Sequence, residues 1–281
     1  MRKNIIIIFL LIWCYNAYCN KVFVLAGQSN MRGRNCWLDD LPSSLTGKQN
    51  GVKWYSSNDV WTTLCAPTEP LPISGGYFTD WGPEISLGNK LFSEIGEDVY
   101  LVKHSKGGTT LAHDWNPELS NSLYHSLTAR VFKSVFELGT NYEISGFFWM
   151  QGENDSIVSN YAFNYFSNLT NLINRLRIDF NTPNMPFILG MIHPNNNWPF
   201  VNVIRQAQTN IVLELPFVSS YDTSELSVCG SQVCDNVHYT PESIICLGEE
   251  FSDLWSQTIP EPFTFRFFLI VMYFIIFKFK I

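Results

Sequence analysis

The stretch KVFVLAGQSNM, residues 21–31, decides the fold of this chain. The five residues after Lys21 are all apolar, which is typical of a buried strand. Gly27 and Gln28 end the strand, and Ser29 follows on the turn into the next segment. A serine on such a turn is held exposed, beside backbone amides that favour negative charge. Ser29 is therefore a candidate nucleophile, although a serine that only caps a helix would give the same pattern.

Strand-like and helix-like segments alternate along the rest of the chain. Beyond residues 21–26, we predict strands at residues 98–103, 144–150, 187–192 and 217–221. We predict helices at residues 83–95, 120–138, 160–179, 202–213 and 242–256. This alternation is typical of an α/β fold with helices on both faces of a parallel sheet, here a three-layer α/β/α sandwich with five strands. We expect residues 35–81 to form a long irregular loop, and such loops inside a domain are usually functional.

Polar and glycine-rich segments follow the predicted strands, at the edge of the sheet where α/β proteins bind their ligands. After the second strand, Gly107 and Gly108 could aim backbone N–H groups at a developing oxyanion. After the third strand, Gln151 or Asn154 could donate a side-chain N–H group to the same oxyanion. Each pattern alone also suits an ordinary loop or turn, so only the combination of the glycine pair and the amides at one edge of the sheet indicates an oxyanion hole.

A candidate base lies late in the chain, in the segment that contains Asp235 and His238. The two side chains lie three positions apart, so on one helical turn they would share a side. The aspartate could then orient the imidazole while His238 accepts a proton from Ser29. Of the other histidines, His193 directly follows the fourth predicted strand and could contact a substrate. The remaining three are His104, His113 and His125.

Length and composition narrow the class of protein. A chain of 281 residues, with 46% hydrophobic and 15% charged residues, suits one large globular domain. The net charge of -7 argues against nucleic acid as a partner, because phosphate binding needs clustered Lys and Arg. The cysteine and histidine spacings match no zinc site. Two disulfides are conceivable from the sequence, namely Cys36–Cys65 and Cys229–Cys234.

Both ends of the chain differ from its middle. Residues 1–19 have the charged, apolar and small-residue order of a secretory signal peptide, which leaves residues 20–258 as the folded domain. Residues 259–281 form a hydrophobic tail whose apolar run is shorter than the about 20 residues that a membrane span needs. A short membrane anchor, a removed lipid-anchor signal and an extension without function all stay open, and we favour the anchor. We therefore expect a secreted or extracellular protein that the tail could tether to a membrane.

The sequence resembles the SGNH (GDSL) hydrolases and, within them, the carbohydrate acetylesterases related to sialate O-acetylesterase, with the plant branch most similar. The resemblance extends from about Lys21 to Trp255 and is strongest in five stretches. These are VFVLAGQSNMRGR (22–34), WGPEISLGNKL (81–91), LVKHSKGGTTLAHDW (101–115), FFWMQGENDS (147–156) and DNVHYTPESIICLG (235–248). The resemblance implies the SGNH hydrolase fold, whose parallel sheet has the flavodoxin-like order.

The resemblance also implies roles for particular residues. It makes Ser29 the nucleophile, His238 the base and Asp235 the group that orients His238. It implies an oxyanion hole formed by the backbone of Ser29, by Gly108 and by a side-chain amide. For that amide, the plant branch favours Gln151, and the wider GxND pattern favours Asn154 as a second choice. We expect five further residues to bind substrate, namely Gln28, Asn30, Glu153, Trp115 and His193.

The activity that the resemblance implies is hydrolysis of O-acetyl esters of sugars or polysaccharides through an acetyl-serine intermediate, without metal or cofactor. Aromatic residues on the loops suit stacking on sugar rings, or they could cap the core: Trp37, Trp54, Trp61, Tyr77, Trp81, Trp115 and Trp198. Two alternatives stay open. One is a catalytically silent carbohydrate-binding protein of the same fold, and the other is an esterase of lipids or other short-chain esters. The sequence leaves the glycan and the oligomeric state undefined.

Overall fold

The first predicted strand lies at the centre of the sheet in the computed structural model, which describes residues 19–68, 81–229 and 236–259. Strand β1 (Asn20–Gly27) pairs in parallel with β4 (Val99–Ser105) on one side and with β5 (Tyr142–Met150) on the other. Strands β6 (Phe187–Gly190) and β7 (Val218–Tyr221) continue the sheet in parallel beyond β5. These five predicted strands occur in the spatial order 2-1-3-4-5, which is the flavodoxin-like order.

Two strands were not predicted. Strand β2 (Val52–Tyr55) pairs in parallel with β4, and β3 (Trp61–Thr63) pairs antiparallel with β2 at the edge. The sheet therefore has seven strands in the order β3-β2-β4-β1-β5-β6-β7. The expectation of a wholly irregular loop at residues 35–81 is wrong for this part. Its signal is the Asn58-Asp59 turn between two aromatic runs, where Asp59 adopts a positive φ of 56°.

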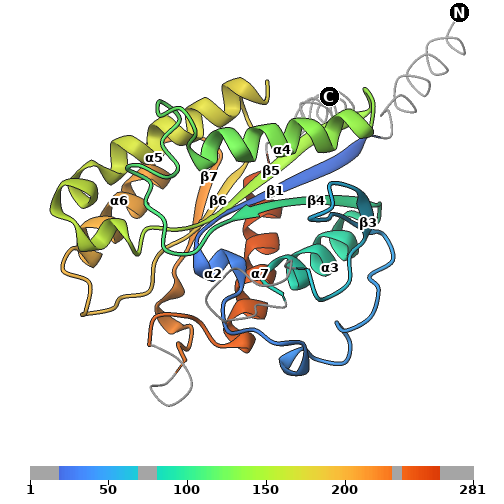
Figure 1. Cartoon of the computed structure of the whole chain (residues 1–281), viewed down its shortest axis with the longest axis horizontal. Helices are drawn as coiled ribbons and strands as arrows, with labels where there is room; N and C mark the ends of the chain where they lie inside the picture. Colours follow the sequence, from blue (N-terminus) through green and yellow to red (C-terminus); the bar gives the residue numbers. More distant parts are fainter. Residues whose placement is uncertain (1–18, 69–80, 230–235, 260–281) are drawn as a thin grey trace, which may run out of the picture.

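Helices cover both faces of the sheet, as predicted (Figure 1). Helices α4 (Leu123–Glu137), α5 (Ser159–Asp179) and α6 (Val201–Glu214) lie on one face. Helices α3 (Glu84–Ile95) and α7 (Pro241–Thr258) pack together on the other face. The shorter elements are α2 (Ser29–Arg32), η1 (Leu38–Asp40), η2 (Asp155–Ile157) and η3 (Thr223–Glu225).

The core lies between the sheet and these helices. Alternate residues of β1 face opposite layers, so Phe23 meets Trp255 of α7 edge-on at 5.0 Å between ring centroids. Trp115 and Trp149 pack edge-on at 5.2 Å. Each large apolar side chain that is fully buried in this way contributes about 1.5–3 kcal/mol to folding. This packing fixes the strand ends on which the candidate site is built.

The predicted signal peptide and hydrophobic tail fall almost entirely outside the described residues, so both stay predictions. Within residues 19–68, 81–229 and 236–259, every helix is too short or too polar to cross a membrane.

Candidate active site

Ser29 is the first residue of α2, directly after the carboxyl end of the central strand. Gly27 has a φ of 146°, and a Cβ atom there would lie 2.1 Å from the carbonyl oxygen of Met150. Only glycine therefore lets β1 end this close to β5 and turn the chain into α2. The Ser29 hydroxyl oxygen lies 2.8 Å from Nε2 of His238, although 209 positions separate the two residues. At this distance a proton can pass from the hydroxyl to the imidazole.

The described part of the segment that carries His238, from residue 236 onward, is a bend followed by a short bridge, and not a helical turn. Tyr239 pairs antiparallel with Val228, and the Cys229 N–H donates to the carbonyl of His238 over 2.8 Å. This pairing replaces the hydrogen bonds that a helical turn would have made. Asp235 lies outside the described residues, so its proposed role beside His238 stays a prediction.

The glycine-rich loop after β4 lies next to Ser29. The Lys106 N–H donates to the carbonyl of Gly27, which holds the start of the loop against the end of β1. A Cβ atom on Gly107 would lie 3.5 Å from Cβ of Ser29. Gly108 has a φ of 70°, and a Cβ atom there would lie 3.9 Å from Nδ2 of Asn154. The structure thus gathers Ser29, the glycine loop and the Asn154 amide at one point.

The two candidate amides differ in what they bind. The Gln151 side chain is fully buried, and its Nε2 donates to the Thr109 carbonyl over 2.9 Å and to Asp155 over 2.6 Å. Both of its amide protons are therefore used inside the protein. Asn154 is half-buried and makes no side-chain cap to the η2 turn that follows it. The Asn154 amide is thus the more available of the two in this structure, while the identity of the oxyanion donor stays a prediction.

Asp155 joins the two loops that flank Ser29, a role that the sequence did not reveal. Its fully buried carboxylate accepts hydrogen bonds from the Leu111 N–H over 2.8 Å and the Ala112 N–H over 3.1 Å. Burial raises the pKa of Asp155, while these donors and Gln151 oppose that rise. Asp155 therefore fixes the glycine-rich loop relative to β5.

Four of the predicted substrate-binding residues are buried and make hydrogen bonds within the protein. Gln28, Asn30 and Glu153 are each at most 2% exposed, and Trp115 is fully buried. Asn30 donates from Nδ2 to Glu153 Oε1 over 2.8 Å, and Gln28 Oε1 lies 3.4 Å from the Gln151 amide. The Trp115 indole donates to the Thr109 hydroxyl over 2.9 Å. In this structure these side chains bond to residues of the site, and their contact with a substrate stays a prediction.

The aromatic residues on the loops are also mostly buried. Trp54, Trp81 and Trp198 are buried, Trp61 is half-buried, and Trp37 is 37% exposed. Tyr77 lies outside the described residues. Most of these rings therefore belong to the core, which was the second of our two interpretations.

Among the other histidines, His193 keeps a place near the site. It is half-buried and meets the ring of Tyr239 edge-on, with 6.3 Å between centroids, and burial lowers its pKa. Burial and the charges of Arg130 and Lys106 lower the pKa of His104 to about 4, which keeps its imidazole neutral. His113 packs against Tyr161, and His125 against Tyr124.

A buried ion pair lies on the other side of α2 and was also not predicted. Lys103 Nζ lies 2.7 Å from Glu84 Oε2, and both side chains are at most 2% exposed. The same ammonium donates to the Arg32 carbonyl over 3.2 Å, and Glu84 accepts from the Gly82 N–H over 2.9 Å. The pair thus connects β4 and α3 to the end of α2.

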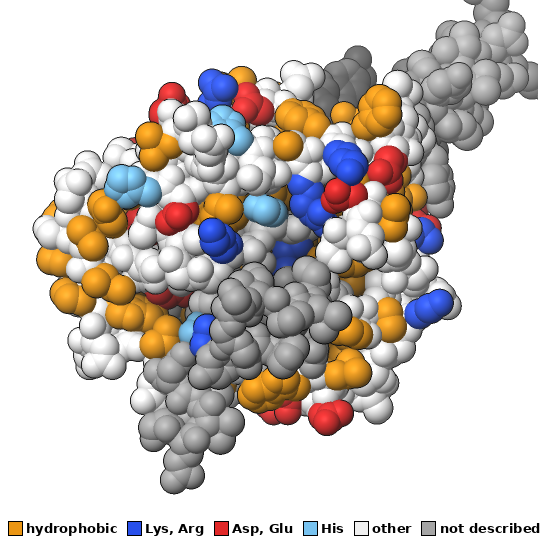
Figure 2. Space-filling model, in the orientation of Figure 1, with side chains coloured by type: hydrophobic (Ala, Val, Ile, Leu, Met, Phe, Trp, Pro, Cys, Tyr) orange, Lys and Arg blue, Asp and Glu red, His pale blue; other side chains and the backbone are white. Residues whose placement is uncertain are grey.

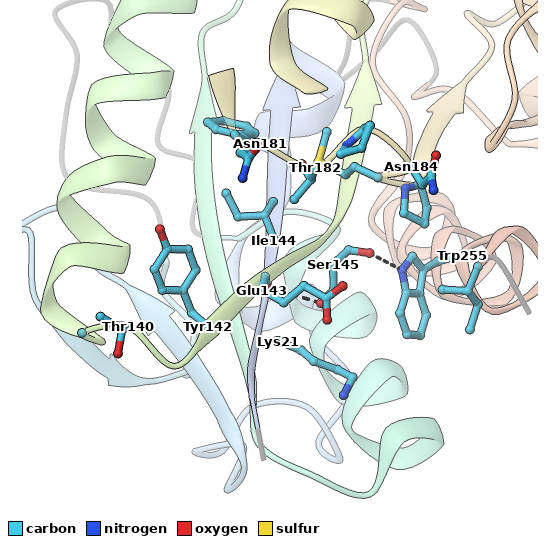
Figure 3. Close-up of a pocket in the computed structure, with 16 residues that line it drawn as sticks. Lys21, Thr140, Tyr142, Glu143, Ile144, Ser145, Asn181, Thr182, Asn184 and Trp255 are labelled. Carbon is cyan, nitrogen blue, oxygen red and sulfur yellow. Dashed lines mark hydrogen bonds between the residues drawn. The ribbon is translucent and has the colours of Figure 1, made fainter. Parts of the chain in front are cut away.

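A large hollow lies away from Ser29, at the amino-terminal edge of the sheet (Figure 3). Its volume is about 900 Å³, and Lys21, Glu143, Ser145 and Trp255 are among its lining residues. The Trp255 indole donates to the Ser145 carbonyl over 2.8 Å. Since a strand rises about 3.3 Å per residue, Lys21 lies roughly 20 Å from the end of β1. This hollow therefore has no part in chemistry at Ser29.

Charge and metal-binding groups are dispersed over the described residues. On the face in Figure 2, basic and acidic side chains are interspersed. The described ranges contain no group of three or more His, Cys, Asp or Glu residues that could hold a metal ion. Cys36 and Cys65 are both free thiols, so the Cys36–Cys65 disulfide is absent. Cys234 lies outside the described residues, so its pairing with Cys229 stays a prediction.

The strand order, the crossover helices and the serine–histidine pair at the end of the central strand define an α/β/α hydrolase of the SGNH type. The sequence matches the family described as carbohydrate esterase, sialic acid-specific acetylesterase, over residues 19–257. The chain therefore belongs to this family of carbohydrate esterases, which are ester hydrolases.

Individual relatives agree with this assignment. The chain is 30% identical over 243 residues to a probable carbohydrate esterase of Arabidopsis thaliana, covering 82% of this chain and 87% of the relative. An Arabidopsis thaliana crystal structure superposes with a TM-score of 0.72 at 26% identity, covering 85% of this chain and 98% of the other. A carbohydrate acetylesterase of Xanthomonas citri shares the fold, with a TM-score of 0.61 at 15% identity, covering 83% of this chain and 55% of the other.

Proposed function

We propose that this protein removes O-acetyl groups from a carbohydrate, with Ser29 as nucleophile and His238 as base. The observation that carries the proposal is the 2.8 Å contact between the Ser29 hydroxyl and His238 Nε2. In the first step, Ser29 attacks the acetyl carbonyl and His238 takes its proton. The sugar oxygen then leaves with that proton, and the acetyl group stays on Ser29. Water, activated by His238, hydrolyses the acetyl-serine and releases acetate.

The oxyanion of each tetrahedral intermediate needs donors on the far side of Ser29 from His238. We assign this role to the backbone N–H groups of Ser29 and Gly108 and to the side-chain amide of Asn154. The support is the position of Gly108 beside Asn154 and the internal use of the Gln151 amide. Removal of one such donor typically costs about 3 kcal/mol of transition-state stabilisation. Asp235 would hold the second nitrogen of His238.

We infer the substrate class from the relatives. The family description specifies an acetylesterase that acts on sialic acid, and the similar Xanthomonas citri protein is named a carbohydrate acetylesterase. Among the described residues, the half-buried His193 beside Tyr239 is the candidate for a contact with the sugar. We propose secretion from the signal-like residues 1–19, and membrane contact through residues 259–281.

The test is acetate release from a panel of acetylated sugars by the wild-type protein and by Ser29→Ala. A matched control is Ser105→Ala, at the end of the neighbouring strand, because the Ser105 hydroxyl is buried without a hydrogen-bond partner among the described residues. We expect release by the wild type and the control and its loss in Ser29→Ala. Sugar binding without acetate release would instead indicate a silent binding protein. A preference for long acyl chains would indicate a lipid esterase.

A further inference from the structure

We propose that Glu153, acting through Asn30, is a positioning residue that holds His238 against Ser29. The inference rests on the proposed function and adds to it a support that is separate from Asp235. Asn30 directly follows the nucleophile in the chain, and Tyr239 directly follows the base. A bond between these two residues therefore links the nucleophile segment to the base segment.

The link is a chain of two buried hydrogen bonds. The Tyr239 N–H donates to Oδ1 of Asn30 over 3.2 Å. The Asn30 amide donates from Nδ2 to Oε1 of Glu153 over 2.8 Å. Asn30 is 1% exposed and Glu153 is 2% exposed, so water competes little for either bond. Glu153 itself follows β5 in the centre of the sheet, which gives the chain of bonds a rigid base.

Glu153 fixes which way the Asn30 amide points. An asparagine side chain has a carbonyl that accepts and an NH₂ group that donates, and the two are nearly equal in shape. The Tyr239 N–H needs the carbonyl end, and an acceptor at Glu153 needs the NH₂ end. Without an acceptor at position 153, the amide could turn and present its NH₂ group to the Tyr239 N–H. Two donors would then face each other, and the segment that carries His238 would lose its anchor.

The Glu153 carboxylate also destabilises the folded protein at its buried position. Among the described residues, Oε2 of Glu153 has no hydrogen-bond partner, and the carboxylate of Asp155 is close enough to repel it. A buried acid with an unused oxygen destabilises the fold. A residue retained only for packing would be better served by an apolar side chain of similar length. We therefore expect an apolar replacement of Glu153 to keep the stability of the protein while it slows reaction at Ser29.

The first test separates stability from reactivity in Glu153→Met. This variant removes the buried charge and the acceptor while it keeps the length of the side chain. The probe is a fluorophosphonate that reacts with an activated serine, and mass spectrometry measures its rate of attachment to Ser29. We expect the variant at pH 8 to unfold at a urea concentration no lower than that of the wild type, yet to label at least tenfold more slowly. Glu153→Gln keeps an acceptor and should label within threefold of the wild type.

The second test exchanges donor and acceptor between the two positions. Asn30→Asp places two acceptors face to face, and we expect labelling about 10²-fold slower, as for other losses of alignment at a reacting centre. In N30D/E153Q, the amide introduced at 153 donates to the carboxylate introduced at 30, which still accepts from the Tyr239 N–H. We expect the double variant to regain at least tenfold over N30D. In esterase assays the losses should affect kcat and leave KM within threefold. The exposed Glu143→Gln, at the far end of β5, serves as the control.

The outcomes distinguish this inference from the proposed function. A wild-type protein whose Ser29 is not labelled would overturn both. A labelled wild type with Glu153→Met equally fast would overturn the positioning role alone, as would a double variant no faster than a folded N30D. A slow Glu153→Met of undiminished stability, or recovery in the double variant, supports it.

Discussion

Glu153 gives a quantitative prediction for the pH dependence of stability. Burial raises its pKa from the ordinary 4.5 to about 7. Because the folded state then holds the proton more tightly than the unfolded state, protonation contributes stability that is fully present below about pH 4.5 and is lost as the pH rises through about 7. At about 1.4 kcal/mol for each pH unit, this contribution is about 3 kcal/mol.

The variant Glu153→Gln removes this titration and keeps a carbonyl acceptor for Asn30. We therefore expect the free energy of unfolding of the variant, minus that of the wild type, to increase by about 3 kcal/mol between pH 4.5 and pH 8.5. Urea denaturation at half-unit pH intervals, followed by tryptophan fluorescence, measures this difference.

Taking the difference between the free energies of unfolding of the variant and the wild type also removes the contribution of His104, whose pH dependence has the opposite sign. The pKa of His104 is lowered to about 4, so its contribution to stability is lost as the pH falls below its ordinary 6.5. Since His104 is unchanged in both proteins, its effect cancels. Glu143→Gln, which alters an exposed carboxylate, should leave the wild-type curve almost unchanged. Parallel curves for Glu153→Gln and the wild type across this range would refute the reasoning.

Three further predictions concern the loops and the ion pair around Ser29. Asp155→Asn replaces one acceptor oxygen by a donor opposite a backbone N–H, so urea denaturation should show a loss of about 2 kcal/mol. Asn154→Ala should lower kcat about 10²-fold while KM and stability stay constant. Gln151→Ala should mainly lower the urea concentration at which the protein unfolds. The reverse pattern would make Gln151 the oxyanion donor. Lys103→Met leaves the Glu84 carboxylate buried without its counter-ion and should cost about 3–5 kcal/mol. Adding Glu84→Gln should recover most of this loss in the same assay, and a double variant no more stable than the single one would contradict the buried-pair assignment.

The sequence predicts the central sheet because its signals are local. Apolar runs such as residues 21–26 end at glycine or polar residues, and helical periodicity separates them. Ser29 and His238 could also be predicted, because one directly follows a strand and the other lies three positions after an aspartate. Strands β2 and β3 escaped prediction because Val52–Tyr55 and Trp61–Thr63 are short, and they become strands only where β2 pairs with β4 and β3 pairs with β2.

The burial of polar residues is the property that the sequence predicts least well. Gln28, Asn30 and Glu153 are polar, and polar residues beside a nucleophile suggest contact with a substrate. Their burial results from close packing between the ends of β1 and β5, which the order of residues alone does not reveal. The choice between Gln151 and Asn154 has the same origin, because only the folded chain shows that Asp155 and Thr109 occupy the Gln151 amide.

The long separation between Ser29 and His238 affects how the protein is made. Ser29 is added to the growing chain 209 residues before His238. Until His238 has been added, a nascent chain can assemble most of the sheet around a serine that has no partner. Under the proposed mechanism, catalytic competence therefore arises only after translation has passed His238, and a chain truncated before His238 would lack the base. Reactivity at Ser29 thus reports that synthesis has passed His238 and that the segment carrying it has docked.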